Sequence, residues 1–358
     1  MADFKKRMAK YNGTDWDFHD ITDRSEFNAG NRNYTASTTT FGSLSGTYKW
    51  AGGVLAPNGC IYGIPYNSTT IVRINTSTDT AATFGSLSGT YKWYGGVLAP
   101  NGFIYGIPYN STTIVKIDPS TNSATTFGSL SGTYKWAGGV LAPNGCIYGI
   151  PRNSPSVLKI DPSTDTATTF GSLNGNTSGN SKWYGGVLAP NGYIYGIPYS
   201  SSKILMIDPS TDTATTFSGM SGYRGGVLGP NGNIYCIPYE ANSVMKIDTN
   251  TNTVSTIGST MSGTYKFEGG VLASNGCIYG MSSLNSTILK IDPSSDTTST
   301  FGSTGTSSFK FVGGVLAQNG SIYGIPNFST SVLKISPSVS LNTPFGESTT
   351  LSPYLNKF

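Results

Sequence analysis

Short apolar runs alternate with turn-forming residues along most of this chain, and the stretch 93–128 shows the pattern clearly. The apolar run 94–99 ends at Pro100-Asn101-Gly102. Asn-Gly after such a run predicts a type I′ hairpin turn, which needs positive φ at both central residues. Asp118 begins a later turn, where its carboxylate can accept backbone N–H groups. The stretch therefore predicts four strands, over residues 94–99, 103–109, 114–117 and 124–127.

The pattern recurs with one conserved element, Gly-Gly-Val-Leu-(Ala/Gly)-x-Asn-Gly. The copies are 40 to 47 residues apart and begin at Gly52, Gly95, Gly138, Gly185, Gly225, Gly269 and Gly313. A regular period of this length is the signature of a repeat architecture. Helical and leucine-rich repeats need a helical period, and no such pattern occurs after residue 35. Four strands in each of seven periods predict an all-β fold, a seven-bladed β-propeller of four-stranded antiparallel blades.

The ends of the repeat region predict how the propeller closes. The segment 35–41 matches the fourth strand of the repeat, so we expect it to pair with the last blade and close the ring. A weaker match at 341–345 contains Pro344 and is the alternative closing strand. On the first expectation the chain beyond Pro337 runs over the surface. The expected domains are an attachment segment at 1–33, the propeller at 34–345 and a tail at 346–358.

Composition limits the classes of partner. Charged residues make up 11% of the chain, against about 25% in an ordinary soluble domain, and the net charge is only +4. Because the lysines form no runs, we expect no nucleic-acid partner. No apolar segment predicts a signal peptide or membrane insertion. Three cysteines begin the second strand of non-adjacent blades, too far apart for disulfides. Buried free thiols formed in a reducing cytoplasm are therefore expected at Cys60, Cys146, Cys236 and Cys277.

The residue types that carry catalysis are scarce. His19 is the only histidine and lies before the repeats, so a Ser or Cys nucleophile in the propeller would lack a histidine base. No cluster has the spacing of a metal site. Most carboxylates fall in turns, and Glu240 and Glu268 are isolated departures from the repeat. We expect no catalytic residue, no metal and no cofactor.

Two repeated elements predict a binding surface on one face. The loop entering the first strand and the loop between strands two and three open on the same side of a blade. The first loop carries Tyr-Lys-Trp or a variant, with cations at Lys49, Lys92, Lys135, Lys182, Arg224, Lys266 and Lys310. The second carries Pro-Tyr-Asn, with candidates at Tyr66, Asn67, Tyr109 and Asn110. These groups could bind an anionic or glycan ligand. Alternatively, the Trp and Phe side chains pack between blades and each lysine extends past them to water.

The N-terminal segment carries a different signal, an Asn-Gly turn between aromatic residues at Tyr11, Asn12, Gly13 and Trp16. This element resembles the Tyr/Trp-Asn-Gly-x-x-Trp motif near the start of many tailed-phage fibre and spike proteins. The resemblance implies that residues 1–33 join the protein to other virion proteins, with the propeller displayed on the particle.

The resulting functional expectation is a non-enzymatic virion protein, assembled in the host cytoplasm. It would serve as a fibre, a decoration protein or a receptor-binding module, with a host-surface glycan as a possible ligand. Two alternatives stay open: a free lectin-like propeller that binds glycans, and a polysaccharide-active enzyme.

Overall fold

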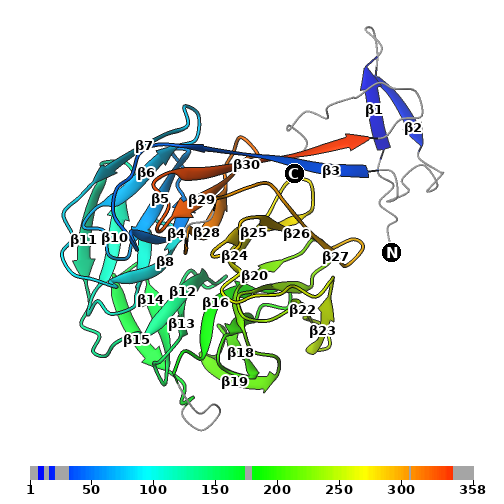
Figure 1. The fold of residues 1–358 in the computed structure, drawn as a ribbon. Coiled ribbons are helices and arrows are strands. Elements are labelled where there is room, and N and C mark those ends of the chain that lie inside the picture. Colours follow the sequence, from blue (N-terminus) through cyan, green and yellow to red (C-terminus); the bar gives the residue numbers. More distant parts are fainter. Residues whose placement is uncertain (1–6, 12–15, 21–31, 174–179, 306–307, 342–358) are drawn as a thin grey trace. The chain divides into compact units, whose positions relative to one another are not determined.

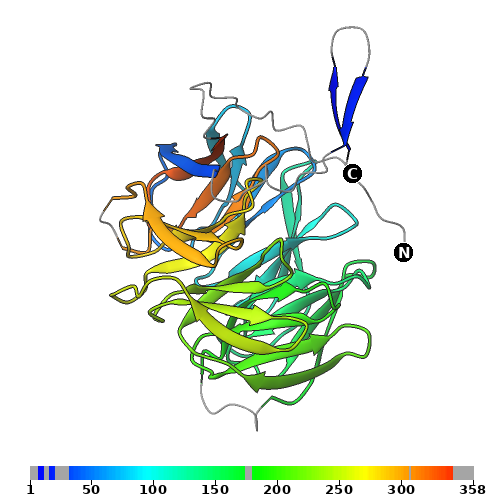
Figure 2. The same cartoon turned by 90° about the vertical axis from the view of Figure 1, so that its right-hand side faces the viewer.

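A computed structural model describes residues 7–11, 16–20, 32–173, 180–305 and 308–341, and this part of the chain contains strands and no helix. The described residues fall into two compact units. Residues 36–338 form the propeller, and the smaller unit contains the hairpin of β1 (Arg7–Tyr11) and β2 (Trp16–Asp20). Figure 2 shows the two strands of this hairpin side by side. They pair antiparallel, with Tyr11 opposite Trp16. The predicted Asn12-Gly13 turn lies outside the described residues.

Seven four-stranded antiparallel sheets confirm the predicted propeller (Figure 1). Blade 1 consists of β4 (Trp50–Leu55), β5 (Cys60–Pro65), β6 (Ile71–Asn75) and β7 (Thr80–Phe84), and blade 2 of β8 (Trp93–Leu98), β9 (Ile104–Pro108), β10 (Ile114–Asp118) and β11 (Ser123–Phe127). Blade 3 consists of β12 (Trp136–Leu141), β13 (Ile147–Pro151), β14 (Val157–Asp161) and β15 (Thr166–Phe170). Blade 4 consists of β16 (Trp183–Leu188), β17 (Ile194–Pro198), β18 (Lys203–Asp208) and β19 (Thr213–Ser218).

The remaining blades are β20 (Tyr223–Leu228), β21 (Ile234–Pro238), β22 (Val244–Asp248) and β23 (Thr253–Ile257); β24 (Phe267–Leu272), β25 (Ile278–Ser282), β26 (Ile288–Asp292) and β27 (Thr297–Phe301); and β28 (Phe311–Leu316), β29 (Ile322–Pro326), β30 (Val332–Leu341) and β3 (Arg32–Phe41).

The last blade closes the ring with the N-terminal strand, as predicted. Its strand order is β28-β29-β30-β3, so β3 supplies the outer strand next to β30. The expectation that the chain leaves the sheet at Pro337 is wrong, because β30 continues to Leu341. The alternative closing segment 341–345 lies outside the described residues except for Leu341, which ends β30.

The hairpin between the first and second strands is not the predicted type I′ turn. In blade 2 the Gly102 N–H donates to the Ala99 carbonyl at 3.0 Å, and the Ala99 N–H donates to the Phe103 carbonyl at 2.9 Å. Gly102 has a φ of 84°, whereas Asn101 is not among the residues with positive φ. The loop is therefore a type I turn followed by a left-handed glycine, the common three-residue hairpin connection. The Asn101 side chain instead accepts the Phe103 N–H.

Close packing at the propeller axis explains the repeated Gly-Gly pair. The first glycine of each pair lies in a β-bulge, seen as a register shift between Trp50 and Gly53 in blade 1. Its φ is 73–81° in all seven blades. A Cβ there would lie only 2.8–3.4 Å from the Cα of the same glycine in the next blade. These seven residues form the glycine ring: Gly52, Gly95, Gly138, Gly185, Gly225, Gly269 and Gly313. The second glycine is also confined, since a Cβ on Gly96 would lie 2.5 Å from Ile64 Cδ1.

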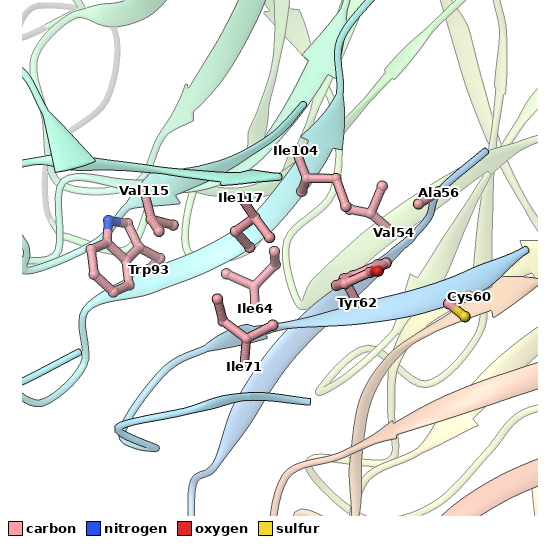
Figure 3. Packing of buried hydrophobic residues seen from close by; sticks show 10 residues of the cluster. All are labelled: Val54, Ala56, Cys60, Tyr62, Ile64, Ile71, Trp93, Ile104, Val115 and Ile117. Atoms are coloured by element: carbon pink, nitrogen blue, oxygen red, sulfur yellow. The ribbon is translucent and has the colours of Figure 1, made fainter. Parts of the chain in front are cut away.

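Apolar side chains from neighbouring blades form the core between them, as Figure 3 shows for blades 1 and 2. Ile64 and Ile71 of blade 1 pack with Trp93 and Val115 of blade 2. The Trp93 indole N–H donates to the Thr113 carbonyl at 2.7 Å, so its one polar group is satisfied. The same inter-blade packing, which is one of the two alternatives that the sequence leaves open, holds for Trp50, Trp136, Trp183 and Phe267.

The tyrosine in the second strand of each blade is fully buried, and in six of the seven blades its hydroxyl also donates to the next blade. Tyr105 is 0% exposed, and its hydroxyl donates to Asp165 Oδ1 of the next blade at 2.7 Å. Lys116, opposite Tyr105 in the sheet, pairs with the other oxygen of Asp165 at 2.5 Å. Equivalent pairs join other blades: Lys159–Asp212, Lys246–Asp296 and Lys334–Asp79. We call each Tyr–Asp–Lys group an inter-blade latch.

The four cysteines are free thiols, three of them buried and Cys146 half-buried. Burial raises the pKa of Cys277 to about 11, so this thiol is protonated at neutral pH. In the described part of the chain, no helix has the length and hydrophobicity that a membrane span requires.

Candidate functional site

The candidate site lies on the face where the loops entering the first strands open, here called the axial face. Three positions in each blade build it. The inner position directly precedes the glycine ring: Ala51, Tyr94, Ala137, Tyr184, Arg224, Glu268 and Val312. The middle position follows the second strand: Tyr66, Tyr109, Arg152, Tyr199, Tyr239, Ser283 and Asn327. The rim position lies two residues before the first-strand aromatic residue: Tyr48, Tyr91, Tyr134, Ser181, Ser221, Tyr265 and Phe309.

The six predicted lysines lie beside these positions. The expectation that each lysine extends to water is wrong, because all six are buried. Lys92 is 3% exposed, and its ammonium donates to the carbonyls of Ser68 at 2.8 Å, Gly89 at 2.9 Å and Tyr66 at 3.2 Å. Two of these carbonyls belong to the preceding blade. The same position is 1–5% exposed in the other five lysines, Lys49, Lys135, Lys182, Lys266 and Lys310.

Hydrogen bonds to backbone carbonyls explain this burial, and Lys49, Lys92 and Lys135 each donate to three of them. A lysine ammonium has three donors, and the loops offer carbonyl acceptors at the right separation. Burial lowers the pKa of Lys49, Lys92 and Lys135 to about 8, whereas three acceptors suit the charged form. The lysines therefore join neighbouring blades, and their ammonium groups are already occupied by backbone carbonyls.

Arg224 does not belong to this set of lysines. Tyr223 pairs with Pro238 as Trp50 pairs with Pro65, so Arg224 falls one position later, at the inner position. Gly222 takes the lysine position instead, where its N–H donates to the Tyr199 carbonyl at 2.7 Å. The expectation that Arg224 is the seventh cation of the lysine set is therefore wrong, and Arg224 has a different role.

Arg224 and Glu268 form an ion pair at the centre of the axial face. Arg224 Nη1 lies 3.0 Å from Glu268 Oε1, with the side chains 16% and 6% exposed. The Tyr94 hydroxyl, from the other side of the ring, donates to the same carboxylate. Burial opposes the charge of Arg224, but Glu268 and the surrounding tyrosines raise the pKa of Arg224 well above its usual value. Burial, followed by the nearby Glu268 charge, raises the pKa of Tyr94.

Tyrosine rings surround this ion pair. The Arg224 guanidinium lies 3.8 Å from the ring centre of Tyr239, 4.3 Å from that of Tyr184 and 4.4 Å from that of Tyr199. The Tyr94 and Tyr184 rings meet edge to face at 5.4 Å. The arrangement gives the axial face one fixed, charged centre inside an aromatic wall.

Tyr66 and Tyr109, both predicted site residues, belong to the same aromatic cluster. Their ring centres are 5.6 Å apart, and the Tyr109 hydroxyl is 3.0 Å from that of Tyr184. Burial raises the pKa of both phenols, so both are neutral donors at physiological pH. Asn67 and Asn110 are brought close to them, but each accepts the backbone N–H of the next blade's rim tyrosine at 2.7 Å. The two asparagines therefore hold the loops together.

Arg152 occupies the middle position of blade 3, where four other blades have tyrosine. Its Nε donates to the Tyr184 hydroxyl at 2.7 Å, and its guanidinium lies 5.1–5.3 Å from the ring centres of Tyr109, Tyr134 and Tyr184. No carboxylate within the described ranges pairs with it. Arg152 is thus a half-buried cation with donors left for an acceptor from outside the chain.

Two buried polar atoms on the axial face have no partner among the described residues, Arg224 Nε and Ser283 Oγ. Ser283 is 0% exposed and replaces a middle-position tyrosine in blade 6. Buried polar groups are normally hydrogen-bonded, and exceptions point to a water molecule or a ligand. The rim above them stays accessible, since Tyr134 is 37% and Tyr265 is 36% exposed.

The described residues contain no group of three or more His, Cys, Asp or Glu side chains placed to hold a metal ion. Glu240 and Glu268, the carboxylates that depart from the repeat, are both engaged: Tyr199 donates to Glu240 at 2.8 Å. Sequence reasoning identified this face but missed Tyr94, Tyr184 and Arg152. Aligning the blades at the residue after each first-strand aromatic residue could have identified the two tyrosines.

A family model described as "Repeat of unknown function (DUF6923)" matches residues 29–190, 100–222 and 189–350. Comparison with curated protein sequences gives no match. Among solved structures, streptogramin B lyase is similar, with a TM-score of 0.71 and 14% identity over 84% of this chain and 98% of that chain. A catalytically inactive variant of virginiamycin B lyase from Staphylococcus aureus, with quinupristin, gives 0.72 and 12% over 84% and 99%. Hydrazine synthase from Kuenenia stuttgartiensis gives 0.64 and 13% over 81% and 96%. At these identities the likeness shows the fold alone.

Proposed function

The chain belongs to the DUF6923 repeat family, and we propose that it is a non-enzymatic binding protein whose axial face holds a glycan. The observation that carries this proposal is the tyrosine cluster around Arg224 and Glu268, which contains the unpartnered Arg224 Nε. The unpartnered Ser283 Oγ lies at a middle position of the same face. Tyrosines offer both an apolar ring face and a hydroxyl, the combination that suits the apolar faces and hydroxyl groups of sugars.

We also propose that the propeller has no catalytic activity of its own. The inactive virginiamycin B lyase variant carries a histidine-to-alanine change. This chain has one histidine, His19, which lies in β2 and outside the propeller. The axial carboxylate of Glu268 is committed to Arg224 and Tyr94, which favours a structural or orienting role over general acid–base work.

The biological setting we propose is a tailed-phage particle, with residues 1–33 as the attachment segment. The Tyr11–Trp16 motif supports this setting, and the pairing of Tyr11 with Trp16 across a hairpin is consistent with a folded attachment element. A free lectin-like propeller would use the same axial face without a particle.

A glycan array with the full chain tests the binding proposal. The double variant Tyr134→Ser and Tyr265→Ser removes two exposed rings and copies Ser181, which holds the same left-handed position with a φ of 63°. We expect binding to weaken roughly tenfold, because two stacking contacts contribute about 1–3 kcal/mol. Tyr193→Asn, which copies Asn233 on the opposite face, is the control and should bind normally. Equal binding by both variants would remove the axial face from the mechanism.

Particle purification tests the setting. Virions made with the wild-type chain should contain it, and a chain lacking residues 1–31 should stay soluble and be absent from particles. This deletion keeps β3 and therefore the closed ring. Wild-type chain absent from particles would leave the free lectin-like protein as the better reading.

A further inference from the structure

The opposite face carries a second site that the proposed function does not use. A cavity of about 420 Å³ lies between blades 7 and 1, lined by Asn58, Gly59, Cys60, Arg73, Asn75, Thr76, Ser77, Gln318 and Asn319. Its size falls within the range of small-molecule sites. None of the nine lining residues is acidic, and one is a cation. The lining therefore favours an anion.

Arg73 is the departure that makes this cavity different from the rest of the ring. It lies opposite Tyr62, where four other blades have the lysine of an inter-blade latch. The latch carboxylate is missing for blade 1, because blade 2 has Asn122 in the position that Asp165 takes in blade 3. In blade 4, Tyr195 bonds to the equivalent asparagine, Asn252, but the residue opposite Tyr195 is the neutral Met206. Blade 1 alone pairs such an asparagine with a cation.

The charge of Arg73 is not neutralised within the described part of the chain. The Cys60 thiol and the Tyr62 hydroxyl interact with its guanidinium, and Arg73 Nε is buried without a partner. Two further donors in the cavity are uncommitted. Asn75 uses its oxygen to accept from Ser77, which leaves Nδ2 free, and the Gln318 carboxamide bonds to no described residue.

We propose that this cavity binds a small organic anion, with a carboxylate, phosphate or sulfate group on Arg73. A guanidinium presents a planar pair of donors that matches the two oxygens of such a group, and these charge-assisted hydrogen bonds are stronger than neutral ones. Asn75 Nδ2 and Gln318 lie in the same lining and can donate to the rest of the ligand. The site is independent of the axial face and of its proposed glycan.

Calorimetric titration of the full chain with glucuronate, inorganic phosphate and glucose tests this proposal. We expect saturable binding of glucuronate, of phosphate, or of both, and none of glucose. Arg73→Met should weaken anion binding about tenfold or more, since it removes a charge-assisted contact. The substitution copies Met206 of blade 4, so the fold should tolerate it, and thermal unfolding checks this.

Lys116→Met is the matched control, because it removes one positive charge at the equivalent strand position of blade 2, outside the cavity. Anion binding should be unchanged in this variant. Three results would overturn the proposal: no saturable anion binding by the wild type, equal binding of glucose, or equal loss in both variants. Loss in Arg152→Tyr but not in Arg73→Met would assign the anion to the axial face and also overturn it.

Discussion

At the residue scale, the buried lysines are expected to matter more for stability than the exposed ones. Lys92→Met would leave the carbonyls of Ser68 and Gly89 without the ammonium donor, and Ser68 belongs to the neighbouring blade. The Tyr66 carbonyl would keep only the backbone N–H of residue 92. We expect the free energy of unfolding to fall by about 2–4 kcal/mol in denaturant titrations. Lys116→Met breaks a half-buried pair whose side chains are 19% and 36% exposed, and it should cost less, about 1 kcal/mol. A smaller loss for Lys92→Met than for Lys116→Met would contradict the linking role.

The lysines also show what the sequence could and could not predict about the site. The repeated Tyr-Lys-Trp placed the lysines on the correct face, next to the correct aromatic residues. Their burial was not predictable, because it depends on carbonyls that the preceding blade brings within 3.3 Å of the ammonium. The residues of the central ion pair, Arg224 and Glu268, depart from the repeat. Tyr94 lies 174 residues from Glu268 in the sequence, and only the closed ring of blades brings the two side chains together.

At the scale of the strand, the glycine ring allows the first strands of neighbouring blades to approach closely. Gly138→Ala adds a Cβ that would lie 2.9 Å from Gly185 Cα, a backbone atom that cannot move aside, at a φ of 80°. Gly145→Ala is the control, with a φ of 79° and no atom within 4 Å. The control measures the conformational cost alone, about 1–2 kcal/mol. Gly138→Ala should lose about 1–3 kcal/mol more in thermal or chemical unfolding. Equal losses would mean that the ring relaxes freely.

The inter-blade latches predict how stability depends on acid. Partial burial works against the charge of Asp79, but hydrogen bonds from Lys334 and Tyr323 lower its pKa below 3.8, and Asp165 and Asp212 are lowered in the same way. A carboxylate with a lowered folded pKa stabilises fully above the unfolded value and loses that stabilisation as pH falls through the folded value. The wild-type free energy of unfolding should therefore drop steeply below about pH 3.8.

The triple variant Asp79→Asn, Asp165→Asn and Asp212→Asn is a direct test of this acid dependence. Asn122 and Asn252 already occupy the same position in two blades and accept the tyrosine hydroxyl there, so the substitutions keep that bond. The variant should be less stable than the wild type at pH 6 and should lose less stability between pH 6 and pH 3. Parallel curves for the two proteins would show that the latches do not cause the acid response.

At the scale of the whole molecule, the number of blades and the closing strand followed from local chemistry repeated at a fixed period. Each copy has its own turns and apolar strands, so its sheet could be predicted without its neighbours. The path beyond Pro337 could not, because among the described third strands β30 alone continues past the position where the other blades have Asp or Asn and a turn. The repeat pattern ends at this point, so it could not predict the length of the last third strand.

Ring closure by β3 makes the two ends of the repeat region interdependent, and deletion can measure this. A chain lacking residues 1–41 removes the outer strand of the last blade and leaves an edge of β30 without its partner. We expect it to unfold at a lower temperature, in a broader transition, and to associate in size-exclusion chromatography. A chain lacking residues 1–31 keeps β3 and should unfold like the wild type. If the longer deletion unfolds as cooperatively and at the same temperature, the ring is held by contacts between inner strands, and the N-terminal strand only covers an edge.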